Sequence, residues 1–252
     1  MSAADDQNLG ELVARKDYHH EPWHSVGGRS LRNIIFGVND GLITAFGFVS
    51  GVSGAHIAFI IVFLTGIAQA LAGAVSMCFG AYLSNKAEQE FFRGEISRER
   101  NEIDSDPKKE TDEIREIYES RGFTPEEIEI LVKRITSDKR RWLSFMMTEE
   151  LGIVAENFDS PWKGAFAIGV SFFVGAIVPV FPYLFASLGV KAMYLSAALT
   201  FISLFLVGVG KTRFTKTSWL SGGFEMLIIG AVAGGLGYGV GRLMSLFGLG
   251  AA

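Results

Sequence analysis

The sequence predicts an all-α membrane protein, in which five transmembrane helices carry a polar helical insert between the second and third spans. Two observations lead to this fold class. The chain contains five apolar runs of about 20 residues, the length that crosses the hydrocarbon core of a bilayer. Charge is also segregated, because 20 of the 27 acidic residues lie between Glu88 and Asp159. Such different compositions indicate different solvents for the two parts of the chain.

The apolar runs define the expected spans. They cover residues 34–52, 57–83, 166–188, 192–209 and 224–247. Only residues 53–56 join the first two runs, so these runs should form an antiparallel hairpin. Pro179 and Pro182 should kink the third span, because a proline removes a backbone donor and clashes with the preceding helical turn.

These spans divide the chain into four parts. Residues 1–30 are expected to be a disordered polar tail, 31–83 the transmembrane hairpin, 84–161 the insert and 162–252 the last three spans. The tail lacks the apolar region of a cleaved signal peptide, so the first span is expected to direct insertion. Its cluster of His19, His20 and His24 could collect metal, but composition favours an unstructured polar segment.

Basic residues predict the orientation of the spans, because lysine and arginine accumulate in the cytosolic connections of membrane proteins. One side of the predicted membrane has Arg15, Lys16, Arg29, Arg32, Lys211, Arg213 and Lys216, and the other has Lys191 and Arg242. The N-terminus and the insert should therefore be cytosolic, and the C-terminus should face a lumen or the cell exterior.

The insert is expected to contain three helices. The first continues the second span through residues 84–103, and the second covers about residues 108–120. The third begins at Thr124, which is followed by proline and then by Glu127 at the third helical position. This pattern is typical of a capping box, and the helix should continue towards Gly152.

Acidic residues of the insert have the spacing of one helix face. Glu99 and Glu102 are three residues apart on the first helix, as Glu110 and Glu113 are on the second. Like charges at this spacing repel one another, so a bound cation is expected to stabilise the face. The alternative is a solvated face on which arginines such as Arg98 pair with the acids.

Two methionines favour the metal interpretation. Met146 and Met147 lie four and three residues before Glu150, and thioether sulfur beside carboxylate oxygen suits a borderline transition metal. The chain lacks the cysteine clusters and the HExxH pattern of zinc sites. An enzyme that oxidises iron would need histidine ligands in a paired-metal carboxylate site, and the insert contains no histidine.

Asp40 is the feature that most favours transport. It is the seventh residue of the first apolar run. Burying an ionised group in hydrocarbon costs at least about 2.5 to 3.5 kcal/mol, so acids inside a membrane span usually mark an ion or proton path. The alternative is a helix-end carboxylate paired with Arg29 or Arg32. The candidate transport path combines this acid with polar and sulfur-containing residues of the first two spans, and comprises Asn33, Asp40, Thr44, Gln69 and Met77.

The chain resembles the vacuolar iron transporter family over residues 29–247. The resemblance rests on GVNDGL at residues 37–42, AVSMCFGAYL at 74–83, FMMTEELG at 145–152 and the acidic insert. It implies a homodimeric, five-spanning exporter that moves Fe2+ from the cytosol to a vacuole in exchange for protons, along a path at the dimer axis. By motif match, Asp40 and Met77 would be translocation ligands. The cytosolic metal site would comprise Glu99, Glu102, Glu110, Glu113, Glu150, Met146 and Met147.

One position departs from the family pattern. Members similar to the plant forms have a glutamate where this chain has Gln69, so proton coupling would depend more strongly on Asp40.

The expected function is transport of Fe2+, with Mn2+, Co2+ or Zn2+ as further substrates and without a prosthetic group. The membrane would be vacuolar in a eukaryote and cytoplasmic in a bacterium. The expected partners are a second copy of the chain, divalent metal ions, protons and lipid, but no nucleic acid. The main alternative is a membrane-anchored metal buffer or sensor, which would have no use for an acid inside the membrane.

Overall fold

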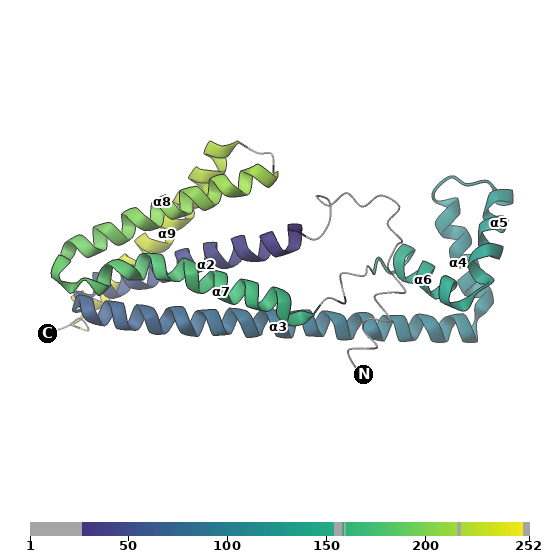
Figure 1. Ribbon diagram of the computed structural model, residues 1–252, viewed down its shortest axis with the longest axis horizontal. Helices are drawn as coiled ribbons and strands as arrows, with labels where there is room; N and C mark the ends of the chain where they lie inside the picture. Colours follow the sequence, from purple (N-terminus) through teal and green to yellow (C-terminus); the bar gives the residue numbers. More distant parts are fainter. Residues whose placement is uncertain (1–26, 154–157, 159, 216–217, 249–252) are drawn as a thin grey trace. The chain divides into compact units, whose positions relative to one another are not determined.

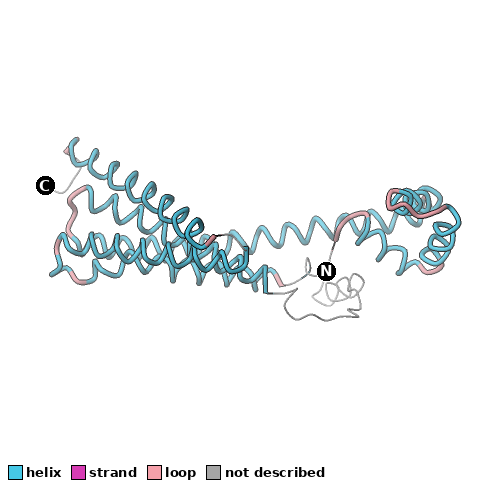
Figure 2. The backbone as a smooth tube through the Cα atoms, turned by 90° about the horizontal axis from the view of Figure 1, so that it is seen from above, coloured by secondary structure: helices cyan, strands magenta, loops and turns pink. Residues whose placement is uncertain are grey.

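The structure is a computed structural model that describes residues 27–153, 158, 160–215 and 218–248. Every regular element in these ranges is a helix (Figures 1 and 2). The described residues divide into two compact units, one containing residues 83–161 and the other containing residues 27–82 and 162–248. The predicted histidine cluster of the tail, His19, His20 and His24, lies outside the described residues.

Within the described ranges, five helices are long and apolar enough to cross a membrane, which agrees with the predicted number of spans. They are α2 (Gly27–Gly54), α3 (Phe59–Ser105), α7 (Pro161–Val180), α8 (Val190–Thr215) and α9 (Trp219–Leu246), and the short 3-10 helices η2 (Phe181–Leu184) and η3 (Ala186–Leu188) follow α7. Large apolar side chains on these helices are exposed, among them Leu64, Val170 and Leu236. Exposed apolar surface of this extent fits contact with lipid better than contact with water.

Glycines allow α2 to contact both α7 and α9 through backbone atoms. A Cβ atom added at Gly41 would overlap the backbone of Phe172 in α7, and one added at Gly241 in α9 would overlap the backbone of Gly51. Small residues at such positions let membrane helices approach closely. The packing therefore fixes the helix that carries Asp40 on two sides.

The two prolines lie where the third span changes from an α-helix to a 3-10 helix. Helix α7 stops one residue after Pro179, and the chain continues as η2 with Pro182 in its first turn. The Pro179 carbonyl accepts a hydrogen bond of 2.6 Å from Ser196 Oγ of α8. A side-chain donor of this kind can satisfy a backbone carbonyl near a proline, where the helical hydrogen-bond pattern is interrupted.

The polar unit contains the charged part of α3 and three further helices, α4 (Pro107–Glu119), α5 (Pro125–Thr136) and α6 (Lys139–Glu149). Helix α3 passes from apolar to charged sequence without a break. The expected capping box is present at the start of α5, where the Glu127 carboxylate accepts a hydrogen bond of 2.8 Å from the Thr124 backbone N–H.

The single helix predicted from Thr124 towards Gly152 is wrong, because the structure has two helices there. The first, α5, ends at Thr136 with Ser137 as its C-cap. Asp138 caps the second, α6, by accepting a hydrogen bond of 2.9 Å from the Arg141 backbone N–H. An aspartate in this role satisfies one of the free N–H groups at a helix start. Two separate helices give the unit its own core, which comprises Ile96, Ile103, Ile114, Ile128, Val132, Ile135, Trp142, Leu143, Met146, Met147 and Ile153.

Candidate metal site

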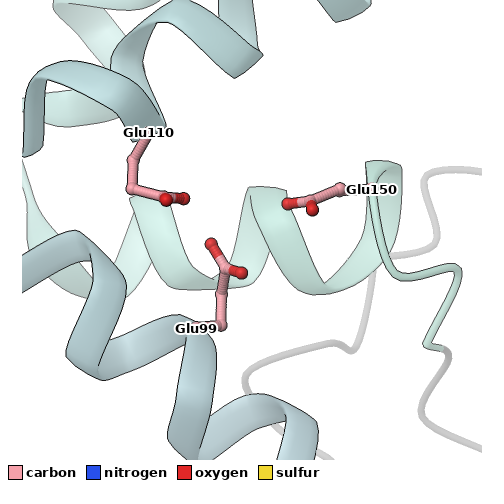
Figure 3. A group of neighbouring side chains, drawn as sticks. All are labelled: Glu99, Glu110 and Glu150. Carbon is pink, nitrogen blue, oxygen red and sulfur yellow. The ribbon is translucent and has the colours of Figure 1, made fainter. Parts of the chain in front are cut away.

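Three glutamates of the polar unit point towards one another (Figure 3). Glu99 comes from the charged part of α3, Glu110 from the first turn of α4 and Glu150 from the C-terminal cap of α6. One carboxylate oxygen of each glutamate lies within 4.8 Å of the other two. Three carboxylates at this separation can share a divalent cation. We call these three residues the glutamate cluster.

Two of these glutamates lie on the same helix faces as apolar residues of the core, and they therefore point inwards. Glu99 is three residues after Ile96, and Glu110 is four residues before Ile114, and both isoleucines are buried in the core. Residues three or four apart share a helix face. An acid on an otherwise apolar stripe is therefore the sequence signal that distinguishes these two from the exposed acids of the insert.

Glu99 and Glu110 are the two buried members of the glutamate cluster. Oε1 of Glu99 and both oxygens of Glu110 are buried and accept no hydrogen bond from any residue that the structure describes. Glu110 has no exposed surface, and Glu99 is only 2% exposed. A buried carboxylate is costly unless it is protonated, paired with a charge or bound to a cation. Lys109 Nζ lies 3.6 Å from Glu110 Oε1 and offsets part of this charge. Bound protons or a bound metal ion would offset the rest.

Burial and mutual repulsion favour the protonated forms when no metal is bound. Burial raises the pKa of Glu99 to about 8, and the nearby charge of Glu150 contributes to this increase. Burial also raises the pKa of Glu110 and of Glu150, and the Glu113 carboxylate raises both further. A metal ion that binds the glutamate cluster near neutral pH must therefore displace protons.

These shifts predict that the metal-free polar unit loses stability as the pH rises from about 5 to about 8. The pKa of a glutamate in the unfolded chain is about 4.3, whereas burial raises the pKa of Glu99 in the folded unit to about 8. In this window the folded state binds more protons, so the free energy of unfolding falls by about 1.4 kcal/mol per pH unit for each extra proton.

Urea unfolding of residues 84–161, followed by circular dichroism at several pH values, measures this slope. Saturating Co2+ should remove most of the loss, because the ion replaces the protons. A free energy of unfolding that rises over the same window would contradict the assigned protonation of Glu99.

Glu102 and Glu113 lie beside the glutamate cluster and are engaged in ion pairs. Glu113 lies 2.9 Å from Lys109 Nζ, and Glu102 lies 3.8 Å from Arg98 Nε. Both carboxylates still raise the pKa of Glu150, so they add negative charge to the site. Arg98 also pairs with Glu95 at 2.6 Å.

Met146 and Met147 are fully buried members of the hydrophobic core. Their helix, α6, ends at Glu149, and the backbone N–H of Glu150 donates to the Met146 carbonyl at 3.0 Å. The structure thus joins both methionines to the turn that presents Glu150. Their role as sulfur ligands stays a prediction.

Asp40 lies in the interior of α2 and is half-buried, which disfavours a helix-end carboxylate. Its Oδ1 accepts a hydrogen bond of 3.3 Å from Thr44 Oγ1, one helical turn later. Met77 packs against the apolar cluster that includes Phe172, and Asn33 is half-buried in α2.

Two amide oxygens of the apolar unit are buried without a hydrogen-bond partner among the described residues, namely Gln69 Oε1 and Asn39 Oδ1. Gln69 belongs to the predicted path. Asn39 was missed, although its position next to Asp40 in an apolar run was a usable signal. Oxygens of this kind are costly in hydrocarbon unless water or a cation reaches them.

Comparison with known proteins gives one consistent result. The model of the VIT family matches residues 31–242. The chain is 36% identical to vacuolar iron transporter 1 of Arabidopsis thaliana over 215 residues, which cover 85% of this chain and 86% of that protein. It is 35% identical to vacuolar iron transporter 1 of Oryza sativa subsp. japonica over 247 residues, covering 96% and 98%. It is 34% identical to the vacuolar iron transporter of Plasmodium falciparum (isolate 3D7) over 241 residues, covering 89% and 88%.

Proposed function

The chain belongs to the VIT family, and from this premise we propose that it transports divalent metal across a membrane, with Fe2+ as its main substrate. The family and its relatives are transporters and not enzymes. Mn2+, Co2+ and Zn2+ are proposed as further substrates. The glutamate cluster is the observation that carries this proposal, because buried carboxylate oxygens that accept no hydrogen bond from the described residues favour a cation.

The proposed direction is from the cytosol to a vacuole lumen or, in a bacterium, to the cell exterior. The distribution of lysine and arginine supports a cytosolic N-terminus and a cytosolic insert. The insert would then collect ions on the side from which they are exported. In the membrane we propose a path along Asp40 and Met77, lined by Asn33, Thr44 and Gln69.

Proton exchange is the proposed driving reaction. Asp40 is the acid of the proposed path, so it would bind either a metal ion or a proton at different stages. Gln69 stands where plant-like family members have a glutamate, and an amide does not titrate. The coupling would therefore depend mainly on Asp40.

A homodimer is proposed because one chain offers too few ligands in the membrane. Asp40 and Met77 supply two ligands, whereas divalent ions take about four to six. A two-fold axis beside both residues would double the set to two carboxylates and two thioethers. Size-exclusion chromatography with light scattering in mild detergent should give the mass of a dimer. Full transport by a single reconstituted chain per vesicle would contradict this proposal.

The rival function is a membrane-anchored metal buffer or sensor. Flux into proteoliposomes separates the two, with a metal-quenched dye and a pH dye enclosed in the vesicles. A transporter should quench the first dye and shift the second in a metal-dependent way. Metal binding without flux would establish the buffer or sensor.

Met77 should determine selectivity among the transported ions. Met77→Leu preserves apolar volume but removes the thioether sulfur, so flux of Fe2+ and Co2+ should fall about tenfold while flux of the harder Mn2+ falls less. Competition assays in the same proteoliposomes measure the ratio. An equal loss for all three ions would assign Met77 a packing role, in line with its contacts to the apolar cluster.

A further inference from the structure

Lys109 is the lysine that the structure places against the carboxylates of the metal site. Its Nζ lies 2.9 Å from Glu113 Oε1 and 3.6 Å from Glu110 Oε1. Glu110 is the fully buried member of the glutamate cluster and accepts no hydrogen bond from the described part of the chain. The ammonium therefore supplies positive charge where a metal ion would otherwise supply it.

The lysine can leave this position without disturbing the helix. Lys109 precedes Glu110 in the first turn of α4, and its side chain is 61% exposed. A lysine has four flexible methylene groups, and its ammonium is well hydrated in water. Rotation about the side-chain bonds would move the charge from Glu110 into solvent.

A divalent ion held by the glutamate cluster would repel this ammonium. The carboxylate of Glu110 would be shared between the two cations, and Coulomb repulsion acts strongly at separations of a few ångströms. The ammonium and the metal ion therefore compete for the same negative charge. Neutralising the lysine removes the competitor but leaves all the carboxylates in place.

We propose that Lys109 is a built-in competitor of the metal ion, which holds Glu110 and Glu113 when the site is empty and moves to solvent when a divalent cation binds. Its effect is to weaken binding and to speed release towards the membrane path. The inference rests on the proposed function of the insert as a metal-loading site. It assigns an affinity-setting role to a residue that is itself not a ligand.

The test compares Co2+ binding by the full-length protein in detergent, measured by calorimetry and by stopped-flow release into a chelator. Lys109→Gln should bind Co2+ about threefold to tenfold more tightly, as expected for removal of a competing ion pair, and should release it more slowly by a similar factor. Lys108→Gln removes an equal charge from the neighbouring exposed position and should change the affinity less than about twofold.

Three results would overturn the proposal or its premise. If Lys109→Gln and Lys108→Gln bind Co2+ with equal affinity, Lys109 acts only through its long-range charge. If Lys109→Gln binds Co2+ more weakly than the unmodified protein, Lys109 stabilises the bound state and does not compete with the ion. Either result leaves the loading function intact. No Co2+ binding by the unmodified protein would instead overturn the metal site itself. Lys109→Arg retains the charge and should keep the affinity at or below that of the unmodified protein.

Discussion

Asp40→Asn should abolish metal flux while the protein stays folded. The substitution preserves size and removes the charge that would meet a metal ion or a proton in the membrane. The pair that is lost consists of the Asp40 carboxylate and the transported ion. Removing one partner of such a buried pair costs about 3 to 5 kcal/mol, so the rate of transport should fall by more than about a hundredfold. Proteoliposomes loaded with a metal-quenched dye measure this loss. The Thr44 hydroxyl can still bond to the amide, so the local structure of α2 should persist.

Glu225→Gln is a suitable control for this experiment. Glu225 is another acid of a candidate span, but it is exposed in α9 and pairs with Lys211 at 2.6 Å. Exposed ion pairs contribute about 0 to 1 kcal/mol, so the flux should stay within about threefold of the unmodified protein. Normal flux by a folded Asp40→Asn protein would remove Asp40 from the transport path.

Much of the fold follows from the local sequence. A run of about 20 apolar residues must form internal backbone hydrogen bonds in lipid, so the five spans could be located without knowledge of their packing. The capping box at Thr124 was also recognisable, because all its atoms come from four adjacent residues. The break before α6 was missed, although Ser137 and Asp138 are residue types that favour caps and turns over helix interiors.

The membership of the glutamate cluster depends on tertiary structure and could be predicted only in part. Spacing placed Glu99 and Glu102 on one helix face, but it could not show that the first faces the core and the second faces Arg98. The approach of Glu150 depends on the separate helix α6, which the sequence pattern did not reveal. Lys109 was not considered because a lysine beside acids usually indicates a solvated face.

The division of the chain into two compact units gives a physical reason for separating the proposed loading site from the proposed membrane path. The glutamate cluster belongs to a unit with its own apolar core, whereas Asp40 belongs to the unit of apolar helices. Substitutions in the two units should therefore affect different steps. Loss of the cluster should impair the capture of scarce ions, and loss of Asp40 should impair the passage of ions at any concentration.

Glu110→Gln should weaken Co2+ binding by the polar unit by about thirtyfold or more, because it removes one of three carboxylates and leaves an amide in a fully buried position. The same change should stabilise the metal-free unit near pH 8, since an amide cannot become charged in this buried position and the change removes a carboxylate that adds to the effect of burial in raising the pKa of Glu99. Opposite changes in stability and affinity would exclude misfolding as the cause of weaker binding.

Glu116→Gln provides the matched control, because Glu116 is exposed on the same helix and lies outside the glutamate cluster. Its Co2+ affinity should stay within about twofold of the unmodified unit. In proteoliposomes, Glu110→Gln should slow flux strongly at low metal concentration and little at saturation, because the insert supplies ions to a path that is itself intact. Undiminished Co2+ binding by Glu110→Gln in calorimetry would mean that the glutamate cluster binds protons and not metal. Equal losses of flux at low and high metal concentration would instead place Glu110 in the transport path.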